Sequence, residues 1–126
     1  MRLLLDSNVL IRSAQGSTPT EAARLVADPD NQPYYSAAAL WEITIKVDSG
    51  KLALPVSPWE LEVGLSSAGY KALDIKVPHV RQLSNLKDLH KDPFDRIMVA
   101  QAIVERMTFL TTDALLGRYS PLVKLV

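Results

Sequence analysis

Apolar and polar positions follow one another in blocks that predict strands alternating with helices along the chain. The first block, Leu3 to Ile11, opens with three consecutive leucines, as expected for a short strand buried on both faces of a parallel sheet. Asp6 follows where this strand ends, and Ser7 and Asn8 favour a turn into a helix. The pattern places Asp6 at the C-terminal edge of a central strand, where ligands bind in open α/β sheets; its simpler role would be to cap the helix.

The next segment carries the signals of a helix start. Thr18 is expected to be the N-cap, Pro19 the first helical residue and Glu21 the reciprocal partner in a capping box. The helix should end at the turn-forming residues 28–33, and the two tyrosines at 34–35 then predict a brief second strand.

Ser36 is expected to cap a helix that runs to about Lys46 and is apolar on most of its circumference. Glu42 lies within this apolar run, where a charge needs a partner or an opening to water. Lys46, one turn later, offers a purely structural explanation, since a Glu–Lys pair at this spacing supports a helix by about 0.2–0.5 kcal/mol. Both explanations of Glu42 stay open at this point.

The middle of the chain repeats the same signals. Ser57, Pro58 and Glu60 predict a capping box and a helix to about residue 68. Residues 70–75 are then typical of a third strand.

Two further helices follow. One is expected from Pro78 to about Leu86, with His79 on its solvated face. The longest runs from Pro93 to about Met107, with Asp92 as its N-cap and Asp95 in its first turn, where a carboxylate favours the positive end of the helix dipole.

The last segment mirrors the first. Phe109 and Leu110 predict a buried fourth strand, Asp113 stands at its C-terminal end, and residues 122–126 suit a last short strand. This alternation predicts one α/β domain over residues 1–126, with a mostly parallel sheet of four to five strands and helices on both faces.

Composition adds limits on function. The hydrophobic fraction of 48% and charged fraction of 22% are ordinary for a globular protein, and no apolar run approaches the ~20 residues of a membrane-spanning helix. No signal-peptide pattern precedes the first strand, and the absence of cysteine excludes disulfides and thiolate zinc sites, which agrees with a cytoplasmic location. Because Lys plus Arg and Asp plus Glu both number 14, any nucleic-acid binding requires a local basic patch.

Carboxylates can converge on one edge of the predicted sheet, because strand ends and helix starts occupy the same edge of a doubly wound fold. Carboxylates this close repel one another unless a divalent cation neutralises them. Oxygen ligands with no nearby His or Cys favour Mg2+ or Mn2+, ions that serve phosphate chemistry. The residues concerned, called the four acids below, are Asp6, Glu42, Asp95 and Asp113.

The segments around the four acids resemble the motifs of the PIN-domain family, and more narrowly those of VapC-type toxins of bacterial toxin-antitoxin pairs. These segments are LLLDSNVLI, SAAALWEITIKVDSGKL, HKDPFDRIMVAQA and TTDALLGRY. The resemblance runs from end to end, and one small departure is Ser7, where such sequences more often carry Thr.

The resemblance implies a Mg2+- or Mn2+-dependent endoribonuclease that hydrolyses phosphodiester bonds with a metal-activated water. It implies structured RNA as substrate, such as tRNA or ribosomal RNA, and a cognate antitoxin that holds the enzyme inactive. By the same resemblance the four acids are catalytic and bind the metal, whereas Asp92 is the cap that positions Asp95. Two alternatives are a catalytically silent PIN-fold binding module and a PIN nuclease of RNA processing that has no antitoxin.

Three other enzyme or signalling classes fit the sequence less well. A haloacid-dehalogenase-like phosphatase needs a second Asp two residues after the first, where this chain has Asn8. A response-regulator receiver would use a phosphoacceptor such as Asp74, which lacks the supporting Gly or Lys context. A P-loop enzyme is excluded because no glycine-rich GK[ST] element is present.

Basic and aromatic residues suggest further contacts. Arg12, Lys46, Lys91 and Arg96 lie near the acidic edge and can hold the RNA backbone, or Lys46 can pair with Glu42 and Arg96 with Asp92. A group of large apolar residues can form a groove for an amphipathic partner helix or a homodimer contact, or can complete the core. Its members are Leu40, Trp41, Leu52, Leu54, Trp59 and Leu61.

Overall fold

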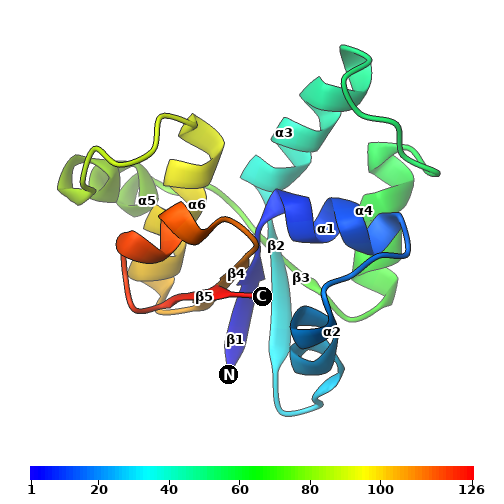
Figure 1. Ribbon diagram of the computed structural model, residues 1–126, viewed down its shortest axis with the longest axis horizontal. Helices are drawn as coiled ribbons and strands as arrows, with labels where there is room; N and C mark the ends of the chain where they lie inside the picture. Colours follow the sequence, from blue (N-terminus) through cyan, green and yellow to red (C-terminus); the bar gives the residue numbers. More distant parts are fainter.

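A computed structural model describes residues 1–126 and contains one five-stranded sheet in the order β3-β2-β1-β4-β5 (Figure 1). All neighbouring strands run parallel. The strands are β1 (Arg2–Leu5), β2 (Gln32–Ser36), β3 (Lys71–Leu73), β4 (Thr108–Thr111) and β5 (Val123–Leu125). The predicted α/β class with a parallel sheet is confirmed.

Six α-helices and two short 3-10 helices connect the strands. They are α1 (Ser7–Ala14), α2 (Thr20–Ala27), α3 (Ala37–Asp48), α4 (Pro58–Ser67), α5 (Val77–Gln82), α6 (Pro93–Glu105), η1 (Leu83–Asn85) and η2 (Ala114–Arg118). None of the helices has the length and apolar character needed to cross a membrane.

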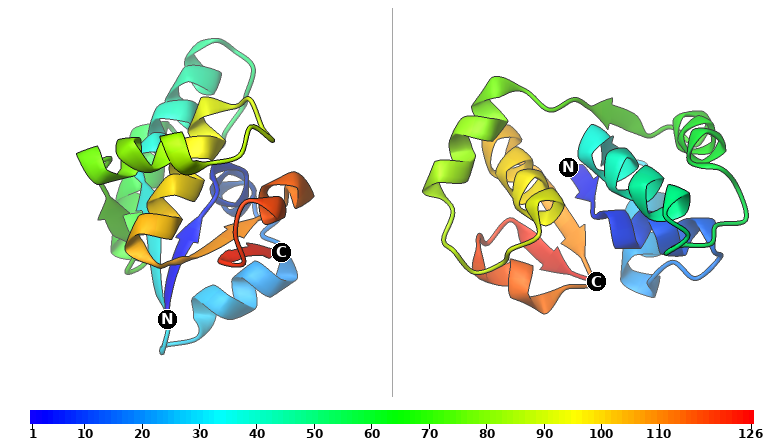
Figure 2. Two further views of the ribbon diagram at one scale, coloured as in Figure 1. Left: turned by 90° about the vertical axis from the view of Figure 1, so that its left-hand side faces the viewer. Right: turned by 90° about the horizontal axis from the view of Figure 1, so that it is seen from above.

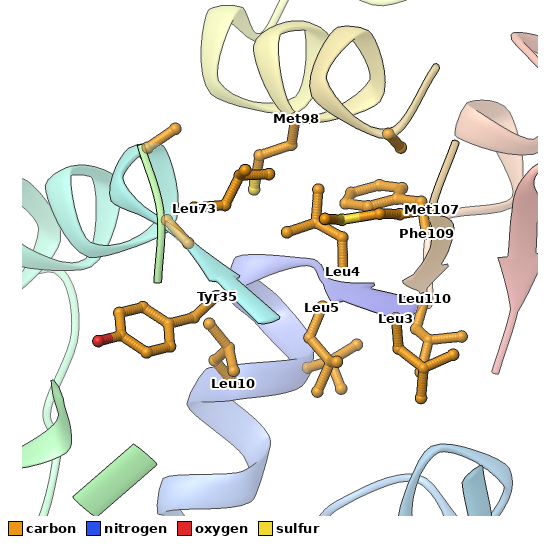
Figure 3. Close-up of a cluster of buried hydrophobic side chains, with 14 of the residues drawn as sticks. Leu3, Leu4, Leu5, Leu10, Tyr35, Leu73, Met98, Met107, Phe109 and Leu110 are labelled. Atoms are coloured by element: carbon orange, nitrogen blue, oxygen red, sulfur yellow. The ribbon is translucent and has the colours of Figure 1, made fainter. Parts of the chain in front are cut away.

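Strand β1 occupies the centre of the sheet, and helices cover both faces of the sheet (Figure 2). Leu4 points toward Met98 of α6, whereas Leu3 and Leu5 point to the opposite face, where Leu10 of α1 lies (Figure 3). The three leucines of β1 are at most 1% exposed, as predicted for an inner parallel strand. The C-terminal end of β1 is thereby fixed at the middle of one sheet edge.

The predicted caps of α3 and α4 are present. The Ser36 hydroxyl accepts a hydrogen bond from the Ala38 amide at 3.0 Å and begins α3. At the start of α4, the Ser57 hydroxyl accepts from the Glu60 amide at 3.1 Å, and the Glu60 carboxylate accepts from the Ser57 amide at 3.5 Å. Side-chain capping therefore sets where both helices begin.

The predicted capping box at the start of α2 is wrong. The helix begins at Thr20, its N-cap position is held by Pro19, and no side chain caps it. Glu21 consequently lies too early in the helix to close a capping box with Thr18. Its carboxylate instead binds the Arg24 guanidinium at 2.7 Å, one turn further along.

The expected solvated position of His79 is also wrong, because its side chain is 1% exposed. Helix α5 is short and packs against α6, which covers this face. The ring is satisfied at both nitrogens: Nδ1 accepts from the Lys76 amide at 2.9 Å, and Nε2 lies 3.4 Å from Glu105 Oε2.

Candidate metal centre

The four acids gather around one pocket of about 250 Å3 at the C-terminal edge of the sheet. No apolar residue lines this pocket, which is called the acidic pocket below. Its lining residues are Asp6, Ser7, Asn8, Glu42, Lys46, Asp92, Asp95, Thr112 and Asp113. The predicted convergence of strand ends and helix starts therefore occurs in the fold.

Asp6 follows β1 and is only 4% exposed. Its Oδ2 accepts a hydrogen bond from the Thr111 hydroxyl at 2.7 Å, and its Oδ1 lies 3.3 Å from the hydroxyl oxygen of Ser7. Although Asp6 occupies the N-cap position of α1, its side chain makes no capping hydrogen bond. Burial raises the pKa of Asp6, an effect that the hydrogen bond from Thr111 partly offsets.

Glu42 lies in the first half of α3 and is 5% exposed. Its Oε1 accepts a hydrogen bond from the Ser7 hydroxyl, so Ser7 contacts two of the four acids. Its Oε2 lies 2.7 Å from Nζ of Lys46, which confirms the expected pair on one helix face. The hydrogen bond to Glu42 raises the pKa of Lys46 and keeps that ammonium charged beside the acidic pocket.

Asp95 lies in the first turn of α6. Asp92 is the N-cap of this helix, as predicted: its Oδ1 accepts from the Phe94 amide at 2.9 Å and from the Asp95 amide at 3.4 Å. The Asp95 side chain is 14% exposed. Burial, together with the negative charges of the neighbouring acids, raises the pKa of Asp95 to about 8. The ionised form of Asp95 is therefore unfavourable in the metal-free pocket.

Asp113 follows β4 and is the most open of the four acids, with 40% of its side chain exposed. Its Oδ1 accepts from the Leu115 amide at 3.0 Å and so caps η2. Its own amide donates to the Thr111 hydroxyl at 3.0 Å. Because the same hydroxyl donates to Asp6, Thr111 fixes the positions of two acids on adjacent strands.

A histidine missing from the sequence prediction stands at the edge of the acidic pocket. Nε2 of His90 lies 3.1 Å from Asp113 Oδ2 and 3.4 Å from Asp95 Oδ2. The expectation that no His lies near the four acids is therefore wrong. The only sequence signal was its place in the segment HKDPFDR, two residues before Asp92.

The basic residues do not all behave as expected. Arg96 forms no ion pair with Asp92; its Nη1 instead donates to the Lys87 carbonyl at 2.9 Å and to the Tyr119 hydroxyl at 3.1 Å. Arg12, in the last turn of α1, lines neither the acidic pocket nor the pocket beside it. Arg12 and Arg96, two of the four residues predicted to contact RNA, therefore line neither pocket.

Three lysines surround a second pocket of about 450 Å3, called the lysine pocket below. It shares Glu42, Lys46 and Asp92 with the acidic pocket, so the two are continuous. Its remaining members are Ile45, Lys51, Lys91, Pro93 and Phe94. Positive side chains thus lie directly beside the cluster of carboxylates.

The donor set of the acidic pocket fits a hard divalent cation. Its five carboxylates face one ammonium, that of Lys46, so the pocket has excess negative charge. Carboxylate oxygens are the ligands that Mg2+ and Mn2+ prefer, and a cation would relieve the repulsion that raises the pKa of Asp95.

Comparisons with known proteins place these features in a family. The family model of the PIN domain matches residues 3–120. No curated protein sequence gives a significant match.

Several solved structures share the fold along nearly the whole chain. VapBC2 from Rickettsia felis bound to a DNA fragment from its promoter has a TM-score of 0.72 at 18% identity, covering 100% of this chain and 98% of that one. A toxin-antitoxin complex from Klebsiella pneumoniae has a TM-score of 0.68 at 19% identity, covering 97% and 95%. DNA-bound VapBC from Salmonella typhimurium has a TM-score of 0.69 at 12% identity, covering 100% and 97%.

Proposed function

The chain belongs to the PIN domain family, and from this premise we propose that it is a metal-dependent endoribonuclease acting on phosphodiester bonds. The four acids bind Mg2+ or Mn2+, and residues 1–126 act as one domain. The observation that carries the proposal is the gathering of all four acids in one polar pocket, where Asp95 has a pKa raised to about 8. A binding module without catalysis would gain nothing from carboxylates that are placed close enough to repel one another.

The residues around the acids have separate tasks in this proposal. Ser7 and Thr111 orient the buried carboxylates of Glu42 and Asp6 through hydroxyl hydrogen bonds. Asp92 caps α6 and so holds Asp95 at the start of that helix. A bound cation supplies positive charge that polarises the phosphate and lowers the pKa of water. Water attack in line with the departing 3′ oxygen leaves a 5′-phosphate and a 3′-hydroxyl.

The lysine pocket supports RNA as the substrate class. Lys51 and Lys91 line a surface continuous with the acidic pocket, where they can contact the phosphates next to the one that is cut. Structured RNA, such as tRNA or ribosomal RNA, is the substrate that we propose.

We further propose that the protein is a VapC-type toxin held inactive by a cognate antitoxin, and that it forms a homodimer. Matching folds occur in structures described as toxin-antitoxin complexes. The two tryptophans add support, since Trp41 is 59% and Trp59 is 71% exposed. The alternative that both complete the core is wrong, although Leu61, at 7% exposed, does belong to it. Large apolar side chains this exposed are typical of a surface that another chain covers.

The test of the nuclease proposal is cleavage of structured RNA by purified protein with Mg2+ or Mn2+, with EDTA, and by the Asp95→Asn variant. EDTA and Asp95→Asn should each lower cleavage by roughly 100-fold or more, since a bound cation contributes several kcal/mol to such a reaction. Asp74→Asn is the matched control, because Asp74 is exposed and lies outside the acidic pocket. Cleavage undiminished in EDTA, or products that end in a 2′,3′-cyclic phosphate, would contradict the proposal.

A further inference from the structure

We infer that His90 is a positioning residue of the metal centre: its Nε2–H holds carboxylate oxygens of Asp113 and Asp95 for a divalent cation, without binding that cation itself. The inference deepens the proposed function and rests on the metal site that it includes. It is supported by the tautomer of the His90 ring, by the contacts that anchor the ring and by the contrast with His79.

The tautomer follows from the hydrogen bond at the other ring nitrogen. Nδ1 of His90 accepts the backbone N–H of Asp92 at 3.1 Å. A neutral imidazole has one donor and one acceptor nitrogen, so Nε2 carries the proton. This N–H donates to Oδ2 of Asp113 at 3.1 Å and also lies 3.4 Å from Oδ2 of Asp95.

The same tautomer argues against His90 as a metal ligand. By distance alone, His90, Asp95 and Asp113 can each offer one atom to an ion, with these atoms within 4.8 Å of one another. A nitrogen ligand must present a free lone pair, however, and that of Nδ1 is used by the Asp92 amide, whereas Nε2 is protonated. The cation would therefore be held by carboxylate oxygens, and His90 would orient two of those carboxylates from outside.

The loop that carries His90 is anchored by residues from two other segments. The backbone N–H of His90 donates to the Tyr119 hydroxyl at 2.8 Å. Arg96 of α6 donates to the same hydroxyl at 3.1 Å and to the Lys87 carbonyl at 2.9 Å. The imidazole is thus fixed relative to α6, which carries Asp95, and to the segment after β4, which carries Asp113. Such anchoring is what a residue that sets the separation of two carboxylates requires.

His79 shows the same hydrogen-bond pattern away from the acidic pocket. Its Nδ1 accepts from the Lys76 amide at 2.9 Å, and its Nε2 lies 3.4 Å from Glu105 Oε2. Neither His79 nor Glu105 lines the acidic pocket. The two histidines differ in the position of their carboxylate partners, since only those of His90 line the acidic pocket. His79 is therefore a natural control for a purely structural role.

The experiment measures Mn2+ binding without RNA, by calorimetry, for the wild-type protein and for His90→Ala, His90→Gln and His79→Gln. His90→Ala should weaken Mn2+ binding by about tenfold or more, as is usual when a partner of a ligating group is lost. His90→Gln should recover most of this loss, because its amide can donate from nearly the same place. His79→Gln should lower the melting temperature and leave Mn2+ affinity unchanged.

A spectroscopic measurement on the wild-type protein separates positioning from coordination. Electron spin-echo spectra of bound Mn2+ should lack the nitrogen coupling of a directly bound imidazole. This readout does not depend on whether His90→Ala folds. Nitrogen coupling from a bound imidazole, or unchanged or tighter Mn2+ binding in His90→Ala, would overturn the inference. Wild-type protein that binds no Mn2+ would overturn the inference and the proposed metal centre together, whereas His90-dependent Mn2+ binding without RNA cleavage would overturn the nuclease proposal alone.

Discussion

The ammonium of Lys46 lies 2.7 Å from Oε2 of Glu42, so a side chain of the same helix already neutralises one oxygen of this carboxylate. The Ser7 hydroxyl occupies the other oxygen. A divalent cation that binds Glu42 must therefore approach against a fixed positive charge. Lys46 also lines the lysine pocket, so the same side chain faces both the proposed metal and the proposed RNA backbone.

Removing this charge should make metal binding tighter. In Lys46→Met, the Mn2+ affinity measured by calorimetry should rise by about fivefold or more, since repulsion between a nearby unit charge and a divalent ion costs on the order of 1–3 kcal/mol at high effective dielectric. Lys51→Met is the control, because Lys51 lines only the lysine pocket. Weaker Mn2+ binding in Lys46→Met would instead mean that Lys46 is needed to hold Glu42 in place.

The raised pKa of Asp95 predicts how the metal-free protein responds to pH. Its folded-state pKa of about 8 lies above the 3.8 of an unperturbed aspartate, so the folded protein binds more protons than the unfolded chain between these values. The free energy of unfolding should consequently fall as pH rises through this window. In EDTA, the melting temperature of the wild-type protein should drop relative to that of Asp95→Asn between about pH 5 and pH 8.

Metal should reverse this behaviour. A bound cation favours the ionised carboxylate, so Mn2+ binding below pH 8 should release a proton and become tighter as pH rises. With saturating Mn2+, the melting temperature should no longer show the fall with rising pH that is expected in EDTA. Parallel melting temperatures for the wild-type protein and Asp95→Asn at every pH in EDTA would show that Asp95 does not carry the raised pKa.

The position of the four acids could be predicted because it follows from topology. Asp6 and Asp113 end adjacent parallel strands, and Asp95 starts a helix, so the rule that strand ends and helix starts share an edge was sufficient. The caps at Ser36 and Asp92 were equally local signals.

The place of His90 could not be predicted in this way. It depends on hydrogen bonds from Tyr119 and Arg96 to a loop without hydrophobic periodicity, and no local pattern encodes such contacts. The exposure of Trp41 and Trp59 could not be predicted for a different reason. Apolar residues at helical spacing indicate a buried face, but the spacing does not show whether the same domain or another chain buries that face.

The lysine pocket gives a prediction for RNA binding. Lys91→Ala should weaken RNA affinity and lower the dependence of log affinity on log salt by about one counterion, since Lys91 lines the pocket next to the four acids. Arg12→Ala should leave this slope unchanged, because Arg12 lines neither pocket. Fluorescence anisotropy of labelled RNA in EDTA measures the slope without cleavage. A reduced slope in Arg12→Ala alone would place the RNA on the α1 side of the acidic pocket.

The exposed tryptophans predict a protein partner. Trp59 lies on α4 and lines a hollow against Leu40 and Thr44 of α3. Co-expression with the neighbouring open reading frame, followed by affinity purification, should yield a stable complex that no longer cleaves RNA.

Trp59→Ser tests whether this surface is the contact. A side chain that is 71% exposed contributes little to folding, so the melting temperature of the free protein should stay nearly unchanged while the complex is lost. Val77→Ser is the matched control, because Val77 is 68% exposed but lies on α5. A complex that survives Trp59→Ser would place the partner elsewhere, because an apolar contact of this size rarely remains silent at an interface. A complex that still cleaves RNA, or no complex at all, would remove the toxin role and leave the nuclease proposal in place, since catalysis depends on the acidic pocket and not on this surface.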